Sequence, residues 1–243
     1  MTETKEWFAT WFDSEYYHIL YKDRDYQEAE IFMQNLVAFL KLPKQSHILD
    51  LACGKGRHSV YLNKIGFTVT GMDLSKNSIA YAKQFENPNL HFKVHDMRLP
   101  FPERYDAIFN LFTSFGYFND DQTNIKVLLN IKNALDENGI AVIDFMNVNY
   151  VKKHLVPQEK VVKDNITFNI SRKIENQKII KDISFTVNGT KFHFQEKVQF
   201  LTLNTIKDYI SATNLKLKHT FGDYQLKEFD AENSKRLILV LEK

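Results

Sequence analysis

One short segment constrains the fold of this chain more than any other. Residues 48–56 read Ile-Leu-Asp-Leu-Ala-Cys-Gly-Lys-Gly, an apolar run that stops at two closely spaced glycines. A helical pattern follows, and a second apolar run ends at Asp73, nineteen residues after Gly54. This order is typical of a strand–helix–strand unit that binds a nucleotide. The glycines let the backbone approach a ligand at a helix N-terminus, and the second carboxylate can accept hydrogen bonds from ribose hydroxyls.

Asp50, four residues before Gly54, narrows the choice of nucleotide. Loops that bind NAD follow apolar residues and have a third small residue three positions after the second glycine, where this chain has Ser59. A carboxylate at the end of the strand would repel a pyrophosphate, but it would attract a ligand with a cationic amine and a sulfonium. An ordinary strand–helix turn, with glycines used only for packing, is the alternative that needs no ligand.

The stretch from Leu49 to Gly56 resembles motif I of the class I S-adenosylmethionine-dependent methyltransferases. Within that family the chain is most similar to small-molecule methyltransferases, and the resemblance covers residues 30–150 and resumes from about 203. The matching segments are residues 54–59, 71–75, 95–98, 111–118 and 221–224. The resemblance implies a Rossmann-like fold and S-adenosylmethionine as the cofactor.

The hydrophobic pattern divides the chain into two parts. Apolar strands alternate with helices from about residue 47 to 145, which predicts a doubly wound α/β fold with parallel strands. From about 160 to 203 apolar and polar residues largely alternate, and Asn188-Gly189 is a strong hairpin signal. With the resemblance, this predicts a mostly parallel seven-stranded sheet with an antiparallel β insertion after strand five. Residues 1–154 and 204–243 would form the Rossmann-like domain, with a helical lid at about 1–42. Residues 155–203 would form the insertion, which covers the acceptor side of the site or makes a dimer contact.

The resemblance also implies which residues hold the cofactor. Asp73 would bind both ribose hydroxyls, Asp50 would face the methionyl amine, and Asp96 with the Met97 amide would bind the adenine. Asp73 as a charge at a helix N-terminus and Asp96 as a surface turn residue are the structural alternatives. The full expected set is Asp50, Ala52, Gly54, Gly56, Arg57, Asp73, Leu74, Asp96, Met97, Leu111 and Phe112.

Aromatic residues are concentrated in residues 7–26 and 111–118 and are candidates for the acceptor pocket. The expected pocket residues are Tyr16, Tyr21, Thr113, Ser114 and Tyr117. The catalytic residues stay undetermined, with Tyr17, His58 and Tyr117 as candidates. The alternative is that the N-terminal aromatics form a hydrophobic helix docked on the sheet and that His58 only caps or packs.

Charge and missing motifs limit the choice of acceptor. With 32 basic and 30 acidic residues the net charge is +2, so electrostatics give no case for a nucleic acid. Residues 111–118 lack the Asp/Asn-Pro-Pro-Tyr element of amino-methyltransferases of DNA bases. Methylation of a base at C5 needs a cysteine there, and Cys53 is elsewhere. We therefore expect in-line methyl transfer to a small molecule. A tRNA or protein methyltransferase and a non-catalytic S-adenosylmethionine-binding sensor are the alternatives.

Other features set the expected context. Cys53 is the only cysteine, so no intrachain disulfide is possible, and His91 and His95 are too isolated to indicate a metal site. The first residues carry no apolar signal region, and no segment approaches the length of a membrane span. These features lead us to expect a cytoplasmic monomer or homodimer without a membrane partner.

Overall fold

The computed structural model describes residues 6–23 and 26–243 and contains two sheets. The main sheet has seven strands in the order β10-β11-β5-β4-β1-β2-β3, and a separate four-stranded sheet has the order β6-β7-β8-β9. The strands of the main sheet are β1 (His47–Leu51), β2 (Thr68–Asp73), β3 (Leu90–Val94), β4 (Tyr105–Asn110), β5 (Leu135–Met146), β10 (Lys216–Phe221) and β11 (Arg236–Glu242). This arrangement confirms the predicted α/β fold with an antiparallel β insertion after strand five.

The direction of the strands locates a ligand crevice in the main sheet. β1 pairs in parallel with both β2 and β4. The chain adds β2 and β3 on one side of β1 and then crosses back to add β4 and β5 on the other side, so the strand order reverses at β1. Such a switch point opens a crevice beyond the carboxyl ends of the strands. At the other end of the sheet, β11 runs antiparallel to both β5 and β10.

Helices cover both faces of the main sheet. The helices are α1 (Trp7–Trp11), α2 (Glu15–Leu20), α3 (Tyr26–Leu40), α4 (Arg57–Lys64), α5 (Lys76–Ala82), α6 (Asp121–Ala134), α7 (Val148–His154) and α8 (Leu203–Thr213), with a 3-10 turn at Lys83–Phe85. One core joins the sheet to α3, α4 and α5, and the other joins it to α6 and α8. In α3, Phe32, Met33 and Leu36 are fully buried in the first core at helical spacing.

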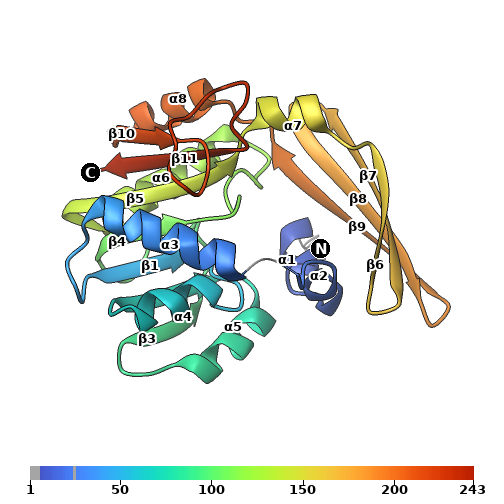
Figure 1. Ribbon diagram of the computed structural model, residues 1–243, viewed down its shortest axis with the longest axis horizontal. Coiled ribbons are helices and arrows are strands. Elements are labelled where there is room, and N and C mark those ends of the chain that lie inside the picture. The colour runs from blue at the N-terminus through green and yellow to red at the C-terminus, as the bar shows by residue number, and fades with distance from the viewer. Residues whose placement is uncertain (1–5, 24–25) are drawn as a thin grey trace, which may run out of the picture.

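The expected lid of about residues 1–42 therefore divides into two parts. The third helix, α3, belongs to the layer over the main sheet, whereas α1 and α2 lie between the two sheets (Figure 1). Residues 1–5 and 24–25 of that expected segment lie outside the described residues. Of the part of this segment that the structure describes, α1 and α2 are the helices placed to cover the carboxyl edge of the sheet.

One strand is longer than the hydrophobic pattern predicts. The hydrophobic pattern predicts that strand five begins at Ile140, after Asn138-Gly139. In the structure, β5 begins at Leu135. Leu135 pairs with Tyr105 and both are fully buried, and the register shifts before Ile140 pairs with Ala107. Pairing of Leu135 with the buried Tyr105 of β4 therefore extends β5 across Asn138-Gly139, a dipeptide that by itself predicts a turn.

The insertion is an antiparallel meander of β6 (Gln158–Lys163), β7 (Ile166–Glu175), β8 (Lys178–Val187) and β9 (Thr190–Gln199). Asn188 and Gly189 join β8 to β9 with φ angles of 49° and 79°, as the predicted tight hairpin requires. The apolar face of this sheet packs on the first two helices: Phe168 and Ile183 share a core with Trp11 and Leu20.

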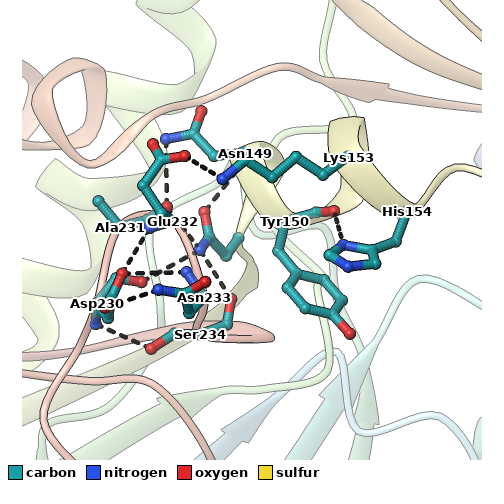
Figure 2. A network of polar contacts seen from close by, with 10 residues as sticks. Asn149, Tyr150, Lys153, His154, Asp230, Ala231, Glu232, Asn233 and Ser234 are labelled. Atoms are coloured by element: carbon teal, nitrogen blue, oxygen red, sulfur yellow. Dashed lines mark hydrogen bonds and ion pairs between the residues drawn. The ribbon is translucent and has the colours of Figure 1, made fainter.

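The helix α7 fixes the start of the insertion to the main sheet. Asn147, its N-cap, donates from Nδ2 to the carbonyls of Ala231 at 3.0 Å and Ser234 at 2.7 Å. Figure 2 shows Lys153 of the same helix paired with Glu232 of the loop that precedes β11. These contacts hold the insertion beside β11, so that β9 passes the carboxyl edge of the main sheet. Within residues 6–23 and 26–243, no helix has the length and apolar character needed to cross a membrane.

Candidate active site

A cavity of about 490 Å³ lies at the carboxyl edge of the main sheet. Its wall has two parts. The sheet half comes chiefly from residues 50–58, 72–81, 95–97 and 111–112, and the lid half comes chiefly from residues 7–22, 113–118 and 196–198. A cavity of this size, with a few polar groups converging on it, is typical of a small-ligand site.

The two glycines after β1 have different roles. Gly54 lines the cavity with a φ of 55°, and a Cβ added to it would meet no atom within 4 Å. Gly56 has a φ of 82°, but a Cβ there would lie 2.6 Å from the ring of Phe92. Gly54 therefore leaves room for a ligand, whereas Gly56 lets Phe92 pack beneath the loop.

Asp73, at the end of β2, organises the sheet half. Its Oδ2 accepts from the Gly54 amide and its Oδ1 accepts from the Ser75 amide, both at 2.8 Å. Burial raises the pKa of this carboxyl, against the lowering effect of these two amides. Because each carboxylate oxygen can accept a further hydrogen bond, the side chain can bind a vicinal diol.

Asp50 is the second acid of the sheet half and is 1% exposed. Its Oδ2 accepts from the Ser59 hydroxyl at 2.6 Å. Burial raises the pKa of Asp50 to about 6, although the Ser59 hydrogen bond lowers it. A cationic ligand group would favour the ionised form of Asp50. The structural role of Ser59 was missed, because no sequence pattern links residues nine positions apart across a turn.

Asp96 follows β3 and is held by Arg98. The Arg98 Nε donates to both carboxylate oxygens at 3.0 Å, and its Nη2 donates to Oδ2 at 2.6 Å. Burial raises the pKa of Asp96, but the hydrogen bonds and charge of Arg98 outweigh it, so the pKa lies below its usual range. Arg98 also pairs with Glu6 at 2.8 Å, which ties the start of α1 to this loop.

A buried ion pair holds the loop after β4. Phe112 and Thr113 have φ angles of 57° and 63°, a conformation that is uncommon for residues other than glycine. Asp144 accepts two hydrogen bonds from the backbone of this loop. Its side-chain carboxylate accepts from the backbone amide of Phe112 at 2.8 Å, and its backbone carbonyl accepts from the backbone amide of Thr113 at 2.9 Å. The Arg236 Nε donates to Asp144 at 2.8 Å, and its Nη2 donates to the Thr113 hydroxyl at 2.9 Å. Asp144 and Arg236 therefore position this strained loop on the cavity wall.

The lid half is a continuous series of aromatic rings. Trp7 and Phe12 contact Tyr117 with ring centroids 5.2 and 5.3 Å apart, and Phe12 contacts Tyr17 at 4.9 Å. Tyr17 in turn contacts Tyr21 at 5.0 Å. We call these five rings, which all line the cavity, the aromatic wall.

The lid is attached to the sheet half through Asp13. The Asp13 Oδ1 accepts from the Ser75 hydroxyl at 2.6 Å and from the backbone amide of Asn77 at 3.0 Å. Ser75 also caps α5 by accepting, through its hydroxyl oxygen, from the backbone amide of Ser78 at 3.0 Å. The lid therefore rests on the same turn that Asp73 organises.

The structure brings most of the predicted site residues to one cavity. Those that line it are Tyr17, Tyr21, Asp50, Ala52, Gly54, Arg57, His58, Asp73, Leu74, Asp96, Met97, Leu111, Phe112, Thr113, Ser114 and Tyr117. Gly56 lies beneath the loop, and Tyr16 packs on Phe185 and Phe192 of the insertion at 4.8 Å. His58 is 8% exposed and stacks on Phe112 at 4.9 Å, an arrangement that supports packing more than proton transfer.

Sequence reasoning missed the cavity residues of the insertion, Glu196 and Val198. A signal was present. Phe192, Phe194, Glu196 and Val198 occupy alternate positions, so a charged residue interrupts an otherwise apolar face of the strand. The pattern identifies Glu196 as unusual but does not say which surface that face covers.

Comparison with known proteins agrees with this geometry. The family model described as "Methyltransferase domain" matches residues 42–207. YqeM of Bacillus subtilis (strain 168), named as a methyltransferase, is 34% identical over 107 residues, which is 42% of this chain and 43% of that protein. A glycine/sarcosine N-methyltransferase of Halorhodospira halochloris is 31% identical over 137 residues, or 52% of this chain and 48% of that protein.

A solved structure extends the likeness to nearly the whole chain. An S-adenosylmethionine-dependent methyltransferase from Clostridium acetobutylicum ATCC 824 superposes with a TM-score of 0.78 at 20% identity, covering 93% of this chain and 95% of that one. At this identity the likeness concerns the fold. The curated relatives, by contrast, are matched over only about half of their length.

The chain belongs to the methyltransferase-domain family, because the family model matches more than half of it. This confirms the resemblance seen in residues 49–56 and the later motifs, and the cofactor of this class is S-adenosylmethionine. The sheet half fits that molecule. Gly54 leaves open space, and three acids offer acceptors for hydroxyl, amino and cationic groups. Asp50, Asp73 and Asp96 are thus the residues that would hold it.

Proposed function

We propose that the protein is an S-adenosylmethionine-dependent methyltransferase that acts on a small-molecule acceptor. The observation that carries this proposal is the division of a single cavity of about 490 Å³ into a sheet half rich in acids and a lid half rich in aromatic rings. The named activity of the Halorhodospira relative, which methylates small amino acids according to its name, supports an acceptor of this size. A cytoplasmic location is part of the proposal, since one cysteine in 243 residues is typical of a reducing compartment.

In this proposal the cofactor is bound by the sheet half in three places. Asp73 accepts from the ribose hydroxyls, Asp96 with the Met97 amide binds the adenine, and Asp50 faces the methionyl amine. When bound, S-adenosylmethionine would supply an electrophilic methyl group, which an acceptor nucleophile takes in line as the carbon–sulfur bond breaks and the neutral thioether S-adenosylhomocysteine leaves. The loop of Phe112 and Thr113, held by Asp144 and Arg236, and the aromatic wall exclude water and orient the acceptor.

Orientation is the main contribution of such a site to catalysis. Holding two reactants in a productive geometry replaces a bimolecular encounter and lowers the barrier by about 7 to 11 kcal/mol in favourable cases. An acceptor that is already nucleophilic then needs no strong base. This agrees with the packed position of His58 against Phe112. Tyr17 and Tyr117 are proposed as pocket residues that contact the acceptor.

The test is a methyl-transfer assay with a panel of amines, alcohols, thiols and carboxylic acids, read by the formation of S-adenosylhomocysteine. We expect turnover with members of one acceptor class and loss of cofactor binding in Asp73→Ala. Binding of S-adenosylmethionine without turnover on any acceptor would instead identify a sensor. Methyl incorporation into tRNA, with binding that weakens as salt rises, would replace the small molecule by an RNA.

A further inference from the structure

The cavity-facing side of β9 carries a charge where the strand pattern requires apolar residues. Phe192, Phe194, Glu196 and Val198 share one face of this strand, because side chains alternate across it. Within this row Glu196 is the charged member. Its side chain is 15% exposed and lines the cavity. Placing a carboxylate on such a face costs desolvation free energy, which interactions with partner groups must offset.

The two carboxylate oxygens of Glu196 have different partners. Two hydrogen bonds fix one oxygen, and the other makes a longer ion pair with Lys181. The Glu196 Oε1 accepts from the Trp11 indole at 2.8 Å and from the Tyr21 hydroxyl at 2.7 Å. Its Oε2 lies 3.9 Å from the Lys181 Nζ, which is beyond hydrogen-bond distance. Among the described residues, Glu196 and Tyr21 line the cavity and Lys181 does not. The carboxylate is therefore held rigidly on the cavity wall, where its one cationic neighbour among the described residues is Lys181.

The aromatic wall runs up to this carboxylate. Tyr17 contacts Tyr21, and the Tyr21 hydroxyl donates to Glu196. The faces of aromatic rings attract organic cations. The Lys181 Nζ already lies 4.6 Å from the centroid of the Tyr21 ring, where it also donates to the Tyr21 hydroxyl at 2.5 Å. Ring faces next to a fixed carboxylate form a site that favours a cation over a neutral group of the same shape and repels an anion.

We infer that the lid half selects an acceptor that carries a positively charged nitrogen, with Glu196 as the specificity-determining charge and Tyr17 and Tyr21 as the surrounding rings. The inference rests on the proposed function, since it assigns the cation to the methyl acceptor. In the proposed function the acids of the sheet half bind the cofactor, so among the described residues that line the cavity Glu196 is the acid left for the acceptor. Recognition of this kind fixes one end of the acceptor and leaves its nucleophilic atom to be oriented toward the loop of Phe112 and Thr113.

A matched pair of probes tests this inference on the full chain. Choline and 3,3-dimethylbutan-1-ol have nearly the same shape and differ by one positive charge. Each is titrated, by calorimetry or saturation-transfer NMR, into protein saturated with S-adenosylhomocysteine. We expect choline to bind about tenfold more tightly than the alcohol. In Glu196→Gln, which keeps an oxygen acceptor for Trp11 and Tyr21, we expect most of the preference for choline to be lost, with the ring faces of Tyr17 and Tyr21 accounting for what remains.

Two further variants complete the design. Glu175→Gln, at an exposed end of β7 in the same sheet, is the matched control and should keep the preference for choline. Lys181→Met removes the cation beside Glu196 and should strengthen choline binding, a change opposite to that of Glu196→Gln. This variant keeps the inference testable even where Glu196→Gln does not fold.

The outcomes separate the inference from the function on which it rests. Equal binding of the two probes to the unmodified protein, or a preference for choline that is undiminished in Glu196→Gln, would overturn the inference while leaving methyl transfer intact. Failure of the unmodified protein to bind S-adenosylhomocysteine in the first titration would overturn the proposed function itself.

Discussion

The two halves of the cavity are built from the chain in different ways. The sheet half takes its three acids from Asp50, Asp73 and Asp96, each at or just after the end of a consecutive parallel strand. The lid half joins residues 7–22, 113–118 and 196–198, which are far apart in the sequence. The first half is thus a property of one repeated strand–helix unit, whereas the second exists only because an insertion folds back over the sheet.

The halves also differ in chemistry. The sheet half offers hydrogen-bond acceptors of defined geometry, which suits a ligand of fixed structure. The lid half offers ring faces and one carboxylate, which recognise charge and shape more than a hydrogen-bonding pattern. A protein that keeps its cofactor and changes its acceptor would therefore vary the lid half.

The largest expected effect concerns the ion pair at the boundary of the two halves. Arg236→Met removes the cationic partner of the buried Asp144 carboxylate, so we expect the free energy of unfolding to fall by about 3 to 5 kcal/mol. Urea denaturation measures this change. The double variant Asp144→Asn/Arg236→Met should recover part of the loss. Lys218→Met, which breaks an exposed pair with Glu242, should change little. An unfolding free energy unchanged in Arg236→Met would show that the pair does not hold the loop.

The next effect isolates the sheet half. Asp73→Ala removes charge-assisted acceptors, so S-adenosylhomocysteine should bind more weakly by about 1.5 to 3 kcal/mol. Calorimetry measures this difference. Asp106→Ala is the control. Its carboxylate accepts from the His47 amide at the start of β1, at the opposite edge of the sheet. Unchanged affinity in Asp73→Ala, or tighter binding of NAD than of S-adenosylhomocysteine, would refute the assignment of this half.

The third prediction concerns pH. Burial raises the pKa of Asp50 to about 6 in the ligand-free protein. A cationic amine favours the ionised form, so binding should release a proton below about pH 6. Affinity for S-adenosylhomocysteine should then rise about tenfold from pH 5 to pH 7. The same raised pKa stabilises the ligand-free fold at low pH, and this contribution is lost as the pH rises through about 6. Asp50→Asn should flatten the affinity profile, and a slope that persists in this variant would assign the proton to another group.

The smallest effect tests the connection between the halves. Asp13→Ala removes the hydrogen bonds from Ser75 and Asn77 that hold the lid on the sheet half. We expect S-adenosylhomocysteine to dissociate about fivefold faster, corresponding to about 1 kcal/mol. Stopped-flow displacement measures this rate, with Asp208→Ala on the exposed side of α8 as the control. An equal rate in the Asp13 variant would mean that the lid does not retain the cofactor.

The sheet half could be predicted almost residue by residue. Parallel strands bring their carboxyl ends to one edge, so residues that follow consecutive strands must meet there. Asp50, Gly54, Asp73 and Asp96 all line the cavity as expected. Gly56 was the exception, because it does not line the cavity. The absence of a side chain at this position makes room for the ring of Phe92, which comes from β3 and which no local pattern links to the loop.

The lid half was predictable only in part. The aromatic character of residues 7–26 indicated a pocket. In the structure, however, Tyr16 packs on Phe185 and Phe192 of the insertion, whereas Tyr17 and Tyr21 line the cavity. Neighbouring residues on a short helix point in different directions. Which direction faces a ligand depends on where the second sheet lies.

The sequence by itself determined the order of the strands and helices, the hairpin at Asn188-Gly189 and the acids of the sheet half, because these follow from hydrophobic period, glycine conformation and strand direction. The tertiary structure alone decided that Asp144 and Arg236 hold the loop after β4 and that Glu196 meets Trp11 and Tyr21. In the sequence, Asp144 and Arg236 are separated by 92 positions, and Glu196 is separated from Trp11 by 185 positions and from Tyr21 by 175. Contacts at such separations depend on how the two sheets and the lid pack together, and local chemistry does not encode that packing.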